Sequence, residues 1–277
     1  MILKTFNAVM IAELKESLRA KWFFLYAIIF GGIIIVLINL GITESQAFGF
    51  TGLSRLLVTY IQFCIVVLPV YILITTVRII VGERESNVLE YFLSMPISLA
   101  AYYWGKLLAR FWVIFLPVAL TISGVVVWGQ VKQMDVPWNI VIYYSLMLGT
   151  LTWCFLGLGI FISSLARKQE MALGLALLSW LILLVFIDII MIALMLQHRI
   201  QENIIIGISL LNPLQTFRTG AILLFDPEMA VLGPASYVII DNLGKMGFLT
   251  FSILYPFGLG WLFSSLGYQI FKRGDII

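Results

Sequence analysis

Charged residues are scarce in this 277-residue chain: they form 11% of it, with 17 lysines and arginines against 14 acids. Apolar residues form 62%, and the mean hydropathy is +1.07. A soluble domain is about 45–50% apolar and about 25% charged, because its surface needs polar groups. The shortage of charge therefore excludes a soluble enzyme and a disordered segment, and the small, dispersed net charge of +3 argues against nucleic-acid binding. We expect an integral membrane protein.

Residues that carry metal or catalytic chemistry are also few. His198 is the single histidine, and the two cysteines, Cys64 and Cys154, lie far apart in separate apolar runs. A His-x-x-x-His metal motif is therefore excluded, and neither a thiolate cluster nor a disulfide is expected. The sequence has no P-loop for nucleotide phosphates and no Gly-x-Ser-x-Gly elbow. Only Asp188 lies deep in an apolar run, whereas ion-coupled carriers usually bury several ionisable groups. A secondary carrier and a membrane-embedded enzyme are thus the weaker hypotheses.

Six apolar segments are long enough to cross a bilayer, whose hydrocarbon core of about 30 Å needs roughly 20 helical residues. The predicted fold is an all-α membrane protein with six transmembrane helices in a single domain, 1–277. An even number of spans places both termini on one side of the membrane. The spans are expected at about 22–43, 56–80, 108–131, 137–164, 171–197 and 246–271.

The positions of the basic residues predict the orientation. With both termini inside, twelve lysines and arginines lie in inner segments and five in outer segments. Because basic residues concentrate in cytoplasmic loops, both termini are expected in the cytoplasm, with the protein in the cell (inner or plasma) membrane. The inner set is Lys4, Lys15, Arg19, Lys21, Arg78, Arg84, Lys106, Arg110, Arg167, Lys168, Lys272 and Arg273, and the outer set is Arg55, Lys132, Arg199, Arg218 and Lys245.

Two further segments outside the spans carry structure. Residues 1–21 place apolar side chains at spacings of three and four, which predicts an amphipathic helix along the inner membrane face. Its apolar stripe is Leu3, Phe6, Met10, Leu14 and Leu18. The outer loop 199–245 is too apolar for a solvated tail, so short helices packed on the outer mouth of the bundle are expected there.

The strongest local signal follows the second span. Gly82 would let that span end, Asn87 and Glu90 have the spacing of a capping box, and Pro96 would end a short helix at about 87–95. The apolar face of this helix is too short to cross a bilayer and needs a protein partner or the interface to cover it. By spacing alone, a charged loop at the headgroups is an equally good interpretation.

The order of these features resembles the type-2 ABC transporter permease family. The residues that carry the resemblance are Gly82-Glu83-Arg84-Glu85 after the second span, a helix ending at Pro96, and Gly105-Lys106 before the third span. The amphipathic N-terminal helix, the six spans and the apolar outer loop are also similar, so the likeness covers nearly the whole chain. It differs at Asn87-Val88, where many relatives carry Gly-Thr.

The resemblance implies a permease subunit that binds no cofactor itself. Two such permeases, with a homodimer expected, would work with two copies of a separate cytoplasmic ABC ATPase that holds ATP and Mg²⁺. The N-terminal helix and the coupling helix at about 87–95 would be the docking surfaces. The implied docking residues are Glu83, Arg84, Glu85, Leu89, Glu90 and Phe92.

The fifth span carries a stripe at spacings of 3, 4, 3 and 4: Asp188, Met191, Met195, His198 and Glu202. A charged Asp deep in a span costs about 2.5–3.5 kcal/mol, so it should face protein or water. In the family the fifth span lines the dimer seam and translocation path, so the first four residues would form a track suited to a soft metal such as Cu(I). The alternative is that the methionines pack in the core and the histidine lies at the headgroups.

Asn212-Pro213 followed by Phe217-Arg218 resembles the same segment in permeases of the nitrous-oxide-reductase maturation (NosY-like) type. The resemblance implies that these residues contact an extracytoplasmic partner that receives a copper- or sulfur-related species. The alternative is an interfacial turn ended by the proline, with Arg218 reaching the headgroups of the surrounding lipid.

The leading hypothesis is the membrane subunit of an ATP-driven exporter. A force-transmitting or assembly subunit, acting on an outer protein while no solute crosses, is the alternative from another class. Lipids, polysaccharides and drugs are alternative cargoes, because the lining residues are mostly generic apolar ones.

Overall fold

The computed structural model describes residues 2–39, 52–90, 97–196, 207–225 and 234–274, and these form helices and turns without a strand. The predicted all-α class is confirmed. The elements are α1 (Ile2–Arg19), α2 (Lys21–Asn39), α3 (Gly52–Thr76), α4 (Ile79–Glu85), α6 (Leu99–Val131), α7 (Trp138–Leu165), α8 (Gln169–Leu181), the π-helix η2 (Ile182–Phe186), α9 (Ile187–Leu196), α11 (Pro213–Phe225) and α12 (Pro234–Gly274).

Five helices are long and apolar enough to cross a membrane: Thr59–Glu85, Leu99–Val131, Trp138–Leu165, Gln169–Ile190 and Asp241–Gly274. A sixth is obtained when the pair Thr5–Arg19 and Phe23–Asn39, bent by 65°, is counted as one span. The expected number of six is therefore an upper value. The separate roles of α1 as an interfacial helix and α2 as the first span remain predictions.

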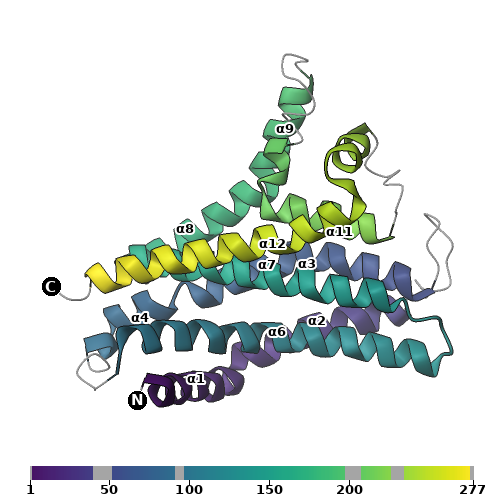
Figure 1. The fold of residues 1–277 in the computed structure, drawn as a ribbon. Helices are drawn as coiled ribbons and strands as arrows, with labels where there is room; N and C mark the ends of the chain where they lie inside the picture. Colours follow the sequence, from purple (N-terminus) through teal and green to yellow (C-terminus); the bar gives the residue numbers. More distant parts are fainter. Residues whose placement is uncertain (1, 40–51, 91–96, 197–206, 226–233, 275–277) are drawn as a thin grey trace.

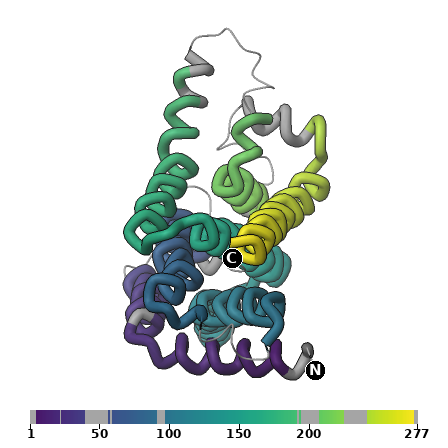
Figure 2. Tube along the Cα trace, turned by 90° about the vertical axis from the view of Figure 1, so that its left-hand side faces the viewer, coloured from purple at the N-terminus to yellow at the C-terminus, as the bar shows by residue number. Residues whose placement is uncertain are grey.

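Both chain termini lie at the same end of the bundle, which we call the N/C end (Figure 1). α4 lies at this end, and α1 lies across the bundle when the molecule is viewed from this end (Figure 2). Near the middle of the bundle in Figure 1, the chain turns after α8 and α9 rises away from the remaining helices, as it also does in Figure 2. The α3, α6, α7 and α12 helices thus form a bundle that α1 crosses at the N/C end, and α9 leaves this bundle at its side.

α7 is the central helix of this bundle. It packs on α3, α4, α6, α8, α11 and α12. Within its most apolar window 67% of the residues are buried, whereas in the span Gln169–Ile190 the share is 6%. α7 is therefore a core helix, whereas the fifth span is only partly covered by this chain: Leu173, Leu175 and Trp180 pack against the core, and Leu178 and Ile189 are exposed.

α7 and α12 approach each other through small residues. A Cβ added at Gly157 would lie 2.3 Å from the carbonyl oxygen of Gly260, and one added at Gly260 would lie 2.6 Å from Trp153 Cδ1. Small residues at such crossings let two helix backbones come close. The van der Waals contacts made there are among the forces that hold helices together in lipid.

The link after the second span differs from its prediction at Asn87. α3 ends at Thr76, the span continues through α4 to Glu85, and Gly82 lies three residues before that end. Asn87 has a φ of 58° directly after the C-cap residue Ser86. Asparagine tolerates this left-handed conformation, whereas an N-cap residue usually has an extended one, so Asn87 is the residue at which α4 ends. Residues 88–90 are helical, and 91–96 lie outside the described residues.

The predicted outer loop contains α11 and the start of α12. α12 begins at Pro234, well before the expected start of the last span, and kinks at Gly244, where φ is 66° and ψ is 165°. Glycine takes this conformation without a Cβ clash. The kink lies two residues before the predicted start of the span at 246, so the span boundary is a change of direction within one helix.

We predict that replacing Gly260 with alanine lowers the thermal unfolding midpoint of the detergent-solubilised protein, because the added methyl group would force α7 and α12 apart. Such overpacking costs about 1–3 kcal/mol. Gly258→Ala is the matched control, since a Cβ there meets nothing within 4 Å. Equal midpoints for the two variants would show that the close crossing does not hold the helices together.

Candidate functional site

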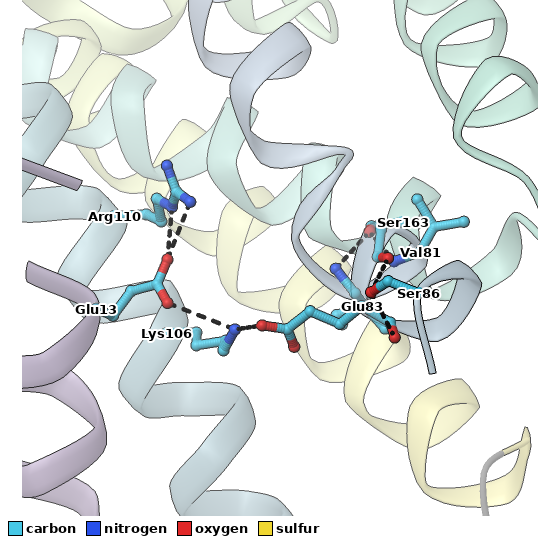
Figure 3. A network of polar contacts seen from close by, with 9 residues as sticks. Glu13, Val81, Glu83, Ser86, Lys106, Arg110 and Ser163 are labelled. Carbon is cyan, nitrogen blue, oxygen red and sulfur yellow. Dashed lines mark hydrogen bonds and ion pairs between the residues drawn. The ribbon is translucent and has the colours of Figure 1, made fainter. Parts of the chain in front are cut away.

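α4 is attached to α7 near both of its ends. A helix begins with N–H groups that have no intrahelical acceptor. For α4 the acceptor is the Ser163 hydroxyl of α7, which receives the N–H of Ile80 at 3.0 Å and that of Val81 at 3.1 Å (Figure 3). Further along, Arg84 Nη1 donates to the carbonyl of Ala166, just past the end of α7, at 3.1 Å. α4 should therefore move together with α7.

Four charged side chains join α4 to α1 and α6, and we call them the ion cluster: Glu13, Glu83, Lys106 and Arg110. Lys106 Nζ lies 3.4 Å from Glu13 Oε2 and contacts Glu83 Oε1 directly. Arg110, one turn further along α6, places Nε and Nη2 each 3.0 Å from Glu13 Oε1. Figure 3 shows these side chains as one continuous series from Arg110 to Glu83.

The ion cluster is neutral and largely buried. The side chains of Lys106 and Glu13 are 7% and 9% exposed, and that of Glu83 is 22% exposed. A buried ion pair adds little net stability because both ions lose water, but removing one partner costs about 3–5 kcal/mol since the other charge stays buried and uncompensated. The ion cluster therefore fixes how α1, α4 and α6 meet.

The structure divides the predicted docking residues into two groups. Glu83 and Arg84 contact the chain's own helices, and Leu89 is 3% exposed, which corrects its assignment as a contact residue. Glu85 and Glu90 are exposed. Phe92 lies outside the described residues. Of the described residues on this segment, Glu85 and Glu90 are the acidic groups that another subunit can reach.

α1 packs on α6 with a face that adjoins the predicted apolar stripe. Glu13 and Ser17 are buried, and the stripe members on either side of them are partly buried: Phe6, Met10, Leu14 and Leu18. The close approach is possible at Gly105 of α6, where a Cβ would lie 3.2 Å from Val9 Cγ1. This contact carries Glu13 to Lys106.

Sequence reasoning missed four residues of this region: Glu13, Lys106, Arg110 and Ser163. One signal was available. Lys106 and Arg110 lie four residues apart near the start of a long apolar helix, where two cations on one face need acidic partners. The serine gave no signal, because a hydroxyl in an apolar helix usually bonds to its own backbone.

Asn212 joins α11 to the irregular turn of the fifth span. Its Oδ1 accepts the N–H of Leu214 at 3.0 Å, and its Nδ2 donates to the carbonyl of Leu183 in η2 at 2.6 Å. Pro213 follows as the first residue of α11, a position where the missing N–H costs nothing. π-Helical turns are rare and are frequent at functional sites, and here one is held by the cap of the neighbouring helix.

Asp188 also connects the fifth span to α11. One carboxylate oxygen accepts from Gln215 Nε2, and the other lies 3.4 Å from Arg218 Nη1. The side chains of Asp188 and Arg218 are 27% and 35% exposed, so this link is partly open to its surroundings. Asp188 thus faces protein, as its cost in lipid requires.

The predicted outer-partner residues are mostly internal. Asn212 and Pro213 are buried, and Phe217 is fully buried, with its ring centroid 6.1 Å from that of Tyr144. Their burial corrects the expectation that they touch a partner, because helix capping and core packing already occupy them. Arg218 is the one member of the set with substantial exposure.

The other residues of the predicted track on the fifth span lie beyond the part of the chain that the structure describes. The side chains of Met191 and Met195, and all of His198 and Glu202, lie outside the described residues. Within the described part of the chain, no three His, Cys, Asp or Glu side chains are placed to hold a metal ion. A role of this stripe with a soft metal stays a prediction.

A cavity of about 340 Å³ lies between α7, η2, the start of α11 and α12. Most of its lining is carbon, including Leu158, Leu183 and Phe263. Its two hydroxyls are already engaged: Ser179 donates to the Leu175 carbonyl and Tyr255 to that of Leu211. The cavity suits an apolar group.

We predict that Glu83→Gln lowers the thermal unfolding midpoint, because Lys106 loses its charged partner on α4. A hydrogen bond to a charged group is worth about 1.5–3 kcal/mol. Glu85→Gln, two residues away on the same helix and exposed, is the matched control and should leave the midpoint unchanged. If both variants unfold at the same temperature, the ion cluster does not hold α4 in place.

Comparison with known proteins identifies the family of this chain. Residues 7–276 match the family described as ABC-2 family transporter protein. The chain is 24% identical over 272 residues to "Probable ABC transporter permease protein NosY" of Stutzerimonas stutzeri, with 94% of this chain and 95% of the relative covered. It is also 24% identical over 227 residues to the protein of the same name from Pseudomonas aeruginosa, covering 79% and 82% of the two chains. Since the family match spans nearly its whole length, the chain belongs to the ABC-2 transporter family and is a multi-pass membrane permease.

Proposed function

We propose that this chain is the membrane-spanning permease subunit of an ATP-driven exporter built from two permeases and two cytoplasmic ATPase subunits. ATP and Mg²⁺ are held by the ATPase, and the permease performs no chemistry itself. The observation that carries the proposal is α4, which is tied by hydrogen bonds and ion pairs to α1, α6 and α7 while Glu85 and Glu90 remain exposed beside it.

The anchored α4 suits the transmission of force. An ATPase that closes on ATP can move the spans only through an element that is rigidly attached to them. Ser163 and Arg84 join α4 to α7, and the ion cluster joins it to α6. The N/C end is then the cytoplasmic end, in agreement with the excess of basic residues there and with a location in the cell membrane.

We predict that the double variant Glu85→Lys, Glu90→Lys loses most ATP-dependent transport in reconstituted vesicles while the permease stays folded. Charge reversal at a docking surface places like charges opposite each other, which costs several kcal/mol. The measurement is co-purification of the ATPase together with its stimulation by the permease.

The control is Asp135→Lys, an exposed charge in the turn between α6 and α7, away from the N/C end. Normal transport and normal ATPase binding by the double variant would remove this segment from the docking surface.

The fifth span is the proposed seam with a second copy of the chain. The share of buried residues in its most apolar window is 6%, and the exposed side chains include Leu178, Val185 and Ile189. Lipid or a second permease must cover this surface. A second copy is favoured by the partly exposed ion pair between Asp188 of this span and Arg218 of α11. Such charges are better placed between two subunits than in lipid.

The proposed cargo is a copper- or sulfur-related species delivered for enzyme maturation on the outer side. Both named relatives are called NosY permeases, and the sequence of and after the fifth span supplies soft and imidazole donors at Met191, Met195 and His198. The alternative is force transmission to an extracytoplasmic partner without passage of a solute, for which exposed Arg218 is the contact. The apolar cavity favours lipid or another amphiphile as the alternative cargo.

We predict that Asp188→Leu abolishes ATP-dependent uptake of cargo into inside-out vesicles while expression and ATPase binding persist. Leucine removes the ion pair with Arg218 and leaves that cation without its partner at the seam. Asp188→Asn, which keeps the size and the acceptor for Gln215, is the milder comparison and should retain part of the uptake.

Unchanged uptake in Asp188→Leu would exclude this residue from the path. Wild-type vesicles that hydrolyse ATP yet accumulate no candidate cargo would favour force transmission over transport.

A further inference from the structure

A second pocket, of about 280 Å³, lies at the N/C end where α1, α2, α3 and α6 meet. It adjoins the elbow between α1 and α2 and is separate from the exposed side of α4. Its walls combine two arginines and the hydroxyl groups of Ser17, Tyr71 and Thr75 with apolar side chains, and the permease mechanism proposed above assigns no ligand to this pocket.

The polar wall contains one buried hydroxyl and one arginine for which the described residues supply no partner, whereas the Thr75 hydroxyl already donates to the carbonyls of Tyr71 and Ile72. Ser17 is 3% exposed, and its hydroxyl has no hydrogen-bond partner among the described residues. Arg78 lines the pocket, is exposed, and forms no ion pair with any residue that the structure describes. Arg110 lines it too, with Nε and Nη2 taken by Glu13.

The two arginines that line the pocket differ in whether their charge is balanced by a described acidic partner. The ion cluster is neutral, because Glu13 and Glu83 balance Lys106 and Arg110. Arg78 is the surplus cation. A phosphodiester carries a single negative charge and acceptor oxygens, so it would neutralise Arg78 and satisfy the Ser17 hydroxyl.

The remaining wall is apolar. Phe23, Ile74 and Val113 line it. Just beyond, Phe24 and Leu25 of α2 are 58% and 48% exposed, which is typical of a surface that meets lipid chains. A free phosphate ion would gain nothing from these side chains, whereas a phospholipid would bury its glycerol and upper acyl carbons against them.

We propose that this pocket binds the phosphate group of an anionic phospholipid, with Arg78 and Arg110 as the charge partners and Ser17 as a hydroxyl donor. Exposed Arg19 and Lys21, on either side of Ala20 at the elbow, add attraction for an anionic headgroup. Arg110 also belongs to the ion cluster, so a bound lipid would stabilise the contact between α1 and α6.

The test uses the full-length permease in a neutral detergent, with native mass spectrometry and the thermal unfolding midpoint as readouts. Phosphatidylglycerol should bind and raise the midpoint by mass action. Phosphatidylcholine carries the same phosphodiester, but Arg78, Arg19 and Lys21 repel its choline cation, so at the same concentration it should bind more weakly and raise the midpoint less. Inorganic phosphate, added in a separate arm, should do neither because it gains nothing from the apolar wall. Arg78→Gln should weaken phosphatidylglycerol binding about fivefold, as one arginine near an anionic headgroup is worth about 1 kcal/mol.

Two further variants make the result specific. Ser17→Ala should also weaken binding, and it keeps the test valid if Arg78→Gln does not fold. Arg273→Gln removes an exposed cation from the C-terminal end of α12 and should bind phosphatidylglycerol as the wild type does. Equal binding by wild type, Arg78→Gln and Ser17→Ala would overturn the site. Displacement of the lipid by inorganic phosphate would show a site for free anions and overturn the lipid assignment.

Discussion

The ammonium of Lys106, held between Glu13 and Glu83, is the interaction on which the N/C end of this permease depends. Each of these groups would be costly to bury alone, so α1, α4 and α6 can meet only in the arrangement that brings them together. Arg110 completes the charge balance from the same helix as Lys106. The short helix after the second span, which in isolation would have too few residues to be stable, is thereby given a fixed position.

From α4, a series of contacts continues through α7 to α11 and the fifth span. Ser163 ties α4 to α7, and α7 crosses the bundle to the region where Tyr144 packs on Phe217 of α11. α11 in turn holds the fifth span through Asn212 and Asp188. This series of contacts joins the proposed ATPase-docking end to the proposed path. Coupling along it requires helices with two arrangements, and the π-helical turn at η2 is the irregular point of the fifth span where such a change is least costly.

Local patterns predicted helices well and their ends less well. The spacing of Asn87 and Glu90 fits a capping box, yet a φ of 58° makes Asn87 the residue that ends α4. Asparagine serves both positions, and only the backbone around it distinguishes them. Gly82 lies three residues before the end of the span at Glu85, although the chain already turns once after Thr76. Asn212-Pro213 was interpreted as a partner contact or an interfacial turn, because its bond to Leu183 in η2, 29 positions away, depends on the tertiary structure.

The sequence by itself determined that this chain is a helical membrane protein, because so much apolar surface and so little charge leave lipid as the only solvent and helices as the means of satisfying the backbone. It also carried the family, through the pattern around Gly82–Lys106. Only the tertiary structure decided that Glu83 lies inside and Glu85 outside. Two residues along a helix are about 200° apart, so the packing of α4 against α6 and α7 decides which carboxylate meets Lys106 and which stays exposed.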